Sequence, residues 1–169
     1  DSWKDIWLNE GFATYFEALW HENEYGWFGD DDHDGYWEYM FFRKLSGLRW
    51  EGRSPVYDPF PDILDRVVYN KGAWILHQLR GRLRLTTGDD DAFFSLLEEW
   101  AIDNDRTEGV ATTQQFIDHA SLFAGEDLND FFWPYLRETV VPHLNLEWVK
   151  AEGPFGPDTA IQIRLSDLG

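Results

Sequence analysis

The 169-residue sequence contains no cysteine, which excludes disulfide bridges and thiolate metal sites. Lysine is scarce, and 14 basic against 32 acidic residues give a net charge of −18. This charge argues against nucleic acid as a partner, because binding phosphates requires basic patches. No apolar run approaches the roughly 18 residues that a membrane span needs. None of these absences identifies the compartment in which the protein works.

The acidic residues allow two interpretations. Aspartates gather in runs such as residues 30–32 and 89–91. They are typical of a solvated acidic surface, and they are also typical of a protein adapted to high salt. The sequence leaves both interpretations open.

Hydrophobic periodicity and turn residues predict a mainly helical chain. The predicted helices cover residues 8–25, 35–45, 65–85, 89–104, 112–124 and 128–137. After Pro142 the pattern alternates with a period of two, which predicts strands at residues 144–149 and 160–165. We therefore expect a helical domain over residues 1–140 and the first hairpin of a following β-domain over residues 141–169.

The same periodicity predicts which side chains are buried. On the first helix the predicted apolar face is Phe12, Phe16, Leu19 and Trp20, opposite a stripe of Glu10, Thr14, Glu17 and His21. On the second the buried positions are Tyr36, Tyr39, Met40 and the adjoining aromatic residues, and on the third Val68, Ile75, Leu76, Leu79 and Leu83. Gly11 lies inside the first helix, where it costs about 1 kcal/mol relative to alanine. A glycine at this position indicates the close approach of another backbone. Thr112 and Gln115 have the spacing of a capping box.

Two segments carry side chains that could bind a metal or take part in catalysis. The first is Trp-Lys-Asp-Ile-Trp-Leu-Asn-Glu-Gly-Phe-Ala at residues 3–13, which taken alone is an amphipathic helix with solvated acids. The second is Tyr-Asn-Lys-Gly-Ala at residues 69–73, which taken alone begins a buried helix whose tyrosine belongs to the core.

Together, in this order and about sixty residues apart, the two segments resemble the M1 family of zinc aminopeptidases, which are gluzincins. The resemblance covers about residues 1–140 and implies the helical lobe of a thermolysin-like catalytic domain. It implies that Glu10 is the third zinc ligand, beside two histidines. It also implies that Tyr69 donates its phenol to the oxyanion of the tetrahedral intermediate.

Two family motifs are missing from this sequence. The HExxH helix, which supplies two zinc histidines and a general base, is expected upstream of Asp1, as is the Gly-x-Met-Glu-Asn segment that binds the substrate amine. We therefore expect the fragment to bind no zinc alone and to be inactive. The intact parent is expected to remove N-terminal residues from peptides, with the other domains of the same polypeptide as its partners.

Other polar residues have weaker assignments. Glu17 has two interpretations, a carboxylate that orients a zinc-bound imidazole or a structural acid in an ion pair. The run His21-Glu22-Asn23-Glu24-Tyr25 resembles HExxH but ends in tyrosine and overlaps the Glu10 helix, so we expect no zinc there. The remaining histidines have no metal-ligand spacing and are expected at the surface or in the core: His33, His77, His119 and His143. Arg80 and Lys71 are expected to pair with acids.

A non-catalytic relative is the alternative to an enzyme. The chain would then be a helical scaffold or binding module that resembles the M1 family. The presence of both Glu10 and Tyr69 favours the enzyme, because a scaffold requires neither.

Overall fold

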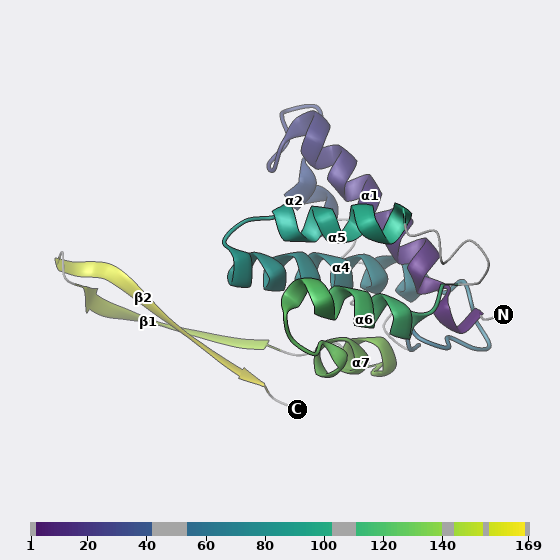
Figure 1. The fold of residues 1–169 in the computed structure, drawn as a ribbon. Coiled ribbons are helices and arrows are strands. Elements are labelled where there is room, and N and C mark those ends of the chain that lie inside the picture. Colours follow the sequence, from purple (N-terminus) through teal and green to yellow (C-terminus); the bar gives the residue numbers. More distant parts are fainter. Residues whose placement is uncertain (1–2, 42–53, 103–110, 140–143, 154–155, 168–169) are drawn as a thin grey trace. The chain divides into compact units, whose positions relative to one another are not determined.

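The computed structural model describes residues 3–41, 54–102, 111–139, 144–153 and 156–167, the last two ranges by their backbone alone. The chain divides into two compact units, residues 1–139 and 140–169. The first unit is helical and the second is a hairpin of two strands (Figure 1). The prediction of a mainly helical chain that ends in a β-hairpin is confirmed.

The helical unit begins with a short 3-10 helix, η1 (Trp3–Asp5). The α-helices that follow are α1 (Trp7–Tyr25), α2 (Tyr36–Glu38), α4 (Arg66–Thr87), α5 (Asp91–Ile102), α6 (Thr113–Ala124) and α7 (Asn129–Arg137). The predicted helix at residues 35–45 is only partly described: α2 continues as a π-helical turn to Phe41, and residues 42–45 lie outside the described part. None of the described helices is long and apolar enough to cross a membrane.

Local signals set several helix boundaries. The Thr112 hydroxyl accepts a hydrogen bond from the backbone N–H of Gln115, and the Gln115 side chain accepts one from the N–H of Thr112, which completes the predicted capping box of α6. Gly125 ends α6 with φ of 67°, a conformation that glycine adopts without strain. Pro134 lies inside α7, which ends at Arg137.

The core lies where α1, α4, α5, α6 and α7 face one another. Its largest fully buried side chains include aromatic residues from four of these helices: Trp7, Tyr15, Phe93, Phe116 and Phe132. All the predicted apolar positions of α4 are buried, as are Tyr36, Tyr39 and Met40 in and after α2, whereas the adjoining aromatic Phe41 is 39% exposed. Long α4 runs through the middle of the unit, and α1 crosses it (Figure 1).

The predicted apolar face of α1 is wrong for two of its four residues. Phe16 and Trp20 are 47% and 52% exposed, whereas Phe12 is buried and Leu19 is partly buried against the core. The buried face instead follows Trp7, Gly11, Tyr15 and Ala18. The rotation of α1 is set by its close approach to α4 at Gly11, which turns Phe16 and Trp20 outward.

The second unit is an antiparallel hairpin. Strand β1 (Leu144–Gly153) pairs with β2 (Gly156–Asp167), and Leu144 lies opposite Asp167. The register shifts between Ala151 and Gly153, close to the turn. Both strands are longer than the alternating pattern predicted.

Candidate active site

Helices α1 and α4 touch backbone to backbone at two glycines. A Cβ atom on Gly11 would lie 2.9 Å from the Cα of Gly72, and a Cβ on Gly72 would lie 2.8 Å from the Cα of Gly11. Real Cβ atoms essentially never approach other atoms this closely. The crossing therefore requires glycine on both helices, as the unexpected glycine inside α1 indicated.

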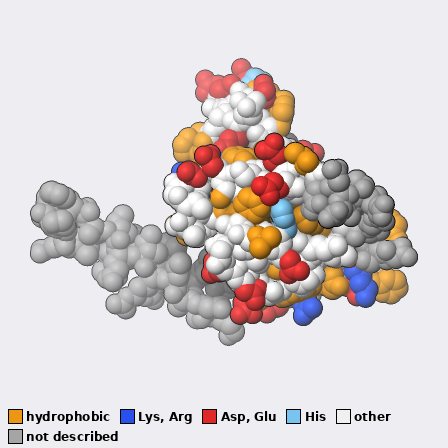
Figure 2. All heavy atoms as spheres, in the orientation of Figure 1, with side chains coloured by type: hydrophobic (Ala, Val, Ile, Leu, Met, Phe, Trp, Pro, Cys, Tyr) orange, Lys and Arg blue, Asp and Glu red, His pale blue; other side chains and the backbone are white. Residues whose placement is uncertain are grey.

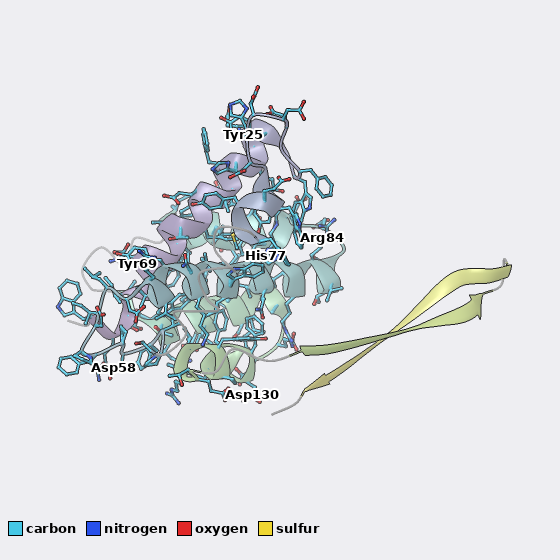
Figure 3. The ribbon with its side chains drawn as sticks, turned by 180° about the vertical axis from the view of Figure 1, so that it is seen from behind. Tyr25, Asp58, Tyr69, His77, Arg84 and Asp130 are labelled. Carbon is cyan, nitrogen blue, oxygen red and sulfur yellow. The ribbon has the colours of Figure 1, made fainter. Side chains whose placement is uncertain are left out.

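This crossing brings together the helix turns that carry Glu10 and Tyr69. Glu10 precedes Gly11 in the first turn of α1, and Tyr69 lies one turn before Gly72 in the first turn of α4. Figure 3 shows Tyr69 near the start of α4, in the region of the crossing. Burial raises the pKa of the Tyr69 phenol, and the nearby Glu10 carboxylate raises this pKa further. The phenol therefore keeps its proton at neutral pH.

The first turn of α4, which carries Tyr69, is fixed by its N-cap. One carboxylate oxygen of Asp65 accepts a hydrogen bond from the backbone N–H of Val67 at 3.1 Å, and the other accepts one from the Ser54 hydroxyl at 3.1 Å. Val67 and Val68 are fully buried. A capped turn with two buried side chains holds the following tyrosine in a defined position.

The first turn of α1, which carries Glu10, is tied to α6. The buried carboxylate of Asp5 accepts a hydrogen bond from the backbone N–H of Thr113 at 2.8 Å. The indole N–H of Trp7 donates to the Thr113 hydroxyl at 2.9 Å. Sequence reasoning missed these positioning residues. More than a hundred residues separate the partners, and no local pattern signals such a pair.

Glu17 lies two turns beyond Glu10 on α1 and accepts a hydrogen bond from the Tyr39 hydroxyl. Lys71 was expected to pair with an acid, but its hydrogen bond is to a backbone carbonyl and not to a carboxylate. Its ammonium donates to the backbone carbonyl of Glu138 at 2.5 Å. Burial lowers the pKa of Lys71, and the Glu138 charge opposes that change.

The segment that resembles HExxH, residues 21–25, is engaged in structural contacts. His21 Nδ1 is hydrogen-bonded to the backbone carbonyl of Asp34 at 2.7 Å, and its ring stacks on Tyr39. Glu22 accepts two hydrogen bonds from the Arg80 guanidinium, at 2.6 and 2.9 Å. The expectation that Arg80 pairs with acids is confirmed.

The other histidines of the helical unit also have structural partners. His33 contacts Asp30, His77 contacts the Tyr36 hydroxyl, and His119 contacts the backbone carbonyl of Leu96. His143 lies outside the described residues. Across the part of the chain that the structure describes, no three His, Cys, Asp or Glu side chains form a group that could hold a metal ion.

Comparison with known proteins decides the family. The model of the peptidase family M1 domain matches residues 1–135. This chain belongs to peptidase family M1. The match includes the helix crossing and both residues, Glu10 and Tyr69, that lie beside it. No solved structure matches this M1 chain significantly.

Among curated proteins, this M1 chain is similar to human endoplasmic reticulum aminopeptidase 2. The two are 33% identical over 84 residues, which cover 46% of this chain. The aligned part is 8% of the human protein, so the chain matches only a small section of that relative.

Proposed function

We propose that this chain is the part of a zinc aminopeptidase that supplies one zinc ligand, Glu10, and one transition-state donor, Tyr69. The observation that supports the proposal is the backbone contact of Gly11 and Gly72, which brings the first turns of α1 and α4, and with them Glu10 and Tyr69, to the same crossing. Family membership and the similarity to a human aminopeptidase support peptides as the substrate class.

Glu10 suits zinc chemically. Its carboxylate is partly exposed at the start of a helix, and Zn²⁺ accepts carboxylate oxygen together with imidazole nitrogen. One carboxylate fills one ligand position, so the proposal requires two further protein ligands from outside this chain. When bound, zinc would polarise the scissile carbonyl and lower the pKa of a water molecule. Glu10 would hold the metal from the α1 side of the site.

Tyr69 would act by hydrogen bonding. An ordinary phenol has a pKa near 10, so its O–H is a donor at neutral pH. A donor fixed in place stabilises an oxygen that becomes negative in the transition state more than it stabilises the neutral carbonyl. The capped first turn of α4 provides this fixed position, because Asp65 and the buried valines hold the backbone that carries Tyr69.

Two substitutions in the longer polypeptide that contains this chain test the proposal. Glu10→Ala should lose zinc and activity together, because the remaining ligands hold the metal weakly. Tyr69→Phe should keep zinc while kcat on an aminoacyl-anilide falls by about 10²–10³ and KM changes little. Atomic absorption and steady-state kinetics measure these outcomes.

Matched controls separate the roles of these residues from general damage. Glu24→Ala removes an exposed carboxylate from the same helix as Glu10, and Tyr135→Phe removes a phenol from α7. Both should keep zinc and activity. Retention of zinc in Glu10→Ala, or near-full activity in Tyr69→Phe, would reject the corresponding assignment.

Glu17 is proposed as a carboxylate that orients a zinc-bound imidazole. Its place on α1, two turns beyond Glu10, supports this role. A ten- to hundredfold loss of zinc affinity in Glu17→Gln is expected, the range typical of such partners. Unchanged affinity would mean that Glu17 serves only its structural contact with Tyr39.

A further inference from the structure

The described helices contain two glycines at a close contact and one without neighbours. Gly11 on α1 and Gly72 on α4 face each other, and the nearest atoms to a Cβ on either are backbone atoms of the partner helix. Gly81 lies on the same helix as Gly72, nine residues further on, and a Cβ there would meet nothing within 4 Å. Glycine weakens a helix interior wherever it occurs. At Gly72 this cost accompanies a contact, and at Gly81 it does not.

Backbone atoms of the partner helix occupy the space that a methyl group at the crossing would need. Backbone atoms cannot rotate aside as the end of a flexible side chain can. For a Cβ on Gly11 to reach an ordinary distance of 3.4 Å from the Cα of Gly72, the separation must increase from 2.9 Å. A Cβ on Gly72 would also lie 3.7 Å from Trp7 Cε3, an ordinary van der Waals distance. The helices would therefore have to move apart.

We infer that the Gly11–Gly72 contact is the positioning device that fixes the place of the Glu10 side chain relative to the Tyr69 side chain. Glu10 is bonded directly to Gly11, and Tyr69 lies one helical turn from Gly72, so any separation of the glycines is transmitted to both side chains. Gly11 and Gly72 are positioning residues, not catalytic ones. That the pair they position comprises a zinc ligand and an oxyanion donor rests on the proposed function.

The test measures the energetic coupling between Glu10 and Tyr69 in three backgrounds. In the 169-residue chain, Glu10→Gln, Tyr69→Phe and the double variant form a double-mutant cycle, read by urea unfolding. The cycle is repeated in Gly72→Ala and in Gly81→Ala. A hydrogen bond of ordinary strength changes the unfolding equilibrium constant by about twofold to tenfold. We expect coupling of this size in the parent and in Gly81→Ala, and its loss in Gly72→Ala.

A purely structural role for Gly72 gives a different result. Gly72→Ala would then be less stable than Gly81→Ala, yet the coupling between Glu10 and Tyr69 would persist. That outcome overturns the inference, as does the absence of coupling in the parent chain.

If the Gly72→Ala variant does not fold, a second measurement tests the inference. In the unmodified chain, NMR cross-relaxation between the Hα protons of Gly11 and Gly72, and between the side chains of Glu10 and Tyr69, should be observed. The lack of either signal overturns the inference. None of these experiments involves zinc. If Glu10→Ala kept zinc in the longer polypeptide, the proposed function would fail while the coupling result still stood.

Discussion

His77 is a titratable residue in an environment that disfavours its charged form. Its Nδ1 is hydrogen-bonded to the Tyr36 hydroxyl at 2.6 Å, and that hydroxyl meets the Tyr15 hydroxyl at 2.9 Å. Burial and, to a smaller extent, the positive charge of Arg80 lower the pKa of His77 to about 4, and the charge of Glu22 opposes the change. Burial likewise raises the pKa of Tyr36 to about 12. The three rings therefore form a neutral hydrogen-bonded chain at pH 7.

We predict that this environment makes the helical unit less stable in mild acid. The pKa of His77 is 6.5 as an ordinary histidine and about 4 in the folded chain. Between these values the unfolded chain binds a proton that the folded chain does not, so stability falls as pH drops through this window. The expected loss between about pH 7 and pH 5 is about 2 kcal/mol. Urea unfolding at the two pH values measures it.

The matched controls are substitutions of two histidines. His77→Gln cannot take up a proton, so the loss of stability between the two pH values should shrink by that amount. His33→Gln removes an exposed histidine and should leave most of the loss in place. An equal pH dependence in His77→Gln and in the parent would contradict the assignment.

Among the elements, α1, α4 and the start of α5 are joined through Arg80. Its side chain is 7% exposed, and beyond its two hydrogen bonds to Glu22 it donates to Asp90 at 2.6 Å. The guanidinium also lies over the rings of Tyr36 and Phe94. A buried cation between two carboxylates matters most when it is removed, because the acids are then left without a partner.

We predict that Arg80→Met costs about 3 kcal/mol of stability, the lower end of the range for a broken buried pair, because Glu22 and Asp90 stay partly hydrated. Methionine keeps much of the bulk, so the loss reports the charge. Arg84→Met is the control: it is 61% exposed and lies 3.9 Å from Asp90, and it should cost less than about 1 kcal/mol. Chemical unfolding of both variants measures the difference. A cost for Arg80→Met as small as that of Arg84→Met would show that the pairs contribute little.

The helices were predictable where the signal is local. The apolar positions of α4 and the capping box at Thr112 depend on residues within a few positions of one another. The buried face of α1 depends instead on a distant segment: the approach of α4 at Gly72 sets the rotation of α1 and exposes Phe16 and Trp20. Composition alone could not show which of its two aromatic-rich sides would be covered.

Some residues of the candidate site were likewise predictable from local sequence, and others depend on distant segments. Glu10 and Tyr69 were identified from their motifs, and the isolated glycine beside Glu10 indicated a close backbone contact. That the partner is Gly72 follows only from the fold. The bonds from Asp5 and Trp7 to Thr113 join residues more than a hundred positions apart, and each of these residue types has many other uses.

At the scale of the whole molecule, the net charge of −18 is the dominant feature. Acidic side chains are spread over the visible face of the helical unit, with few basic ones among them (Figure 2). The runs at residues 30–32 and 89–91 are mostly exposed. Like charges at this density repel one another in the compact state and are relieved when the chain expands.

We predict that salt stabilises the folded chain. The Debye length falls from about 10 Å at 0.1 M to about 3 Å at 1 M ionic strength, so added NaCl screens repulsion between neighbouring carboxylates. The urea midpoint should therefore rise steadily from about 0.05 M to about 1 M NaCl at pH 7, a range chosen to span that change in screening. This rise is expected for a high-salt adaptation and also for an ordinary acidic surface, but it should be steeper in the former.

Substitutions at exposed acids test whether charge is the cause. Changing Asp31→Asn, Asp62→Asn and Glu98→Gln removes three of the 32 acidic residues. Because fewer charges repel, this variant should be more stable than the parent at low salt and should gain less from added NaCl. The matched control changes Asp31→Glu, Asp62→Glu and Glu98→Asp, which keeps every charge and should keep the full dependence on salt. Equal salt dependence in both triple variants would attribute the effect to ion binding at other sites and would contradict repulsion between surface carboxylates.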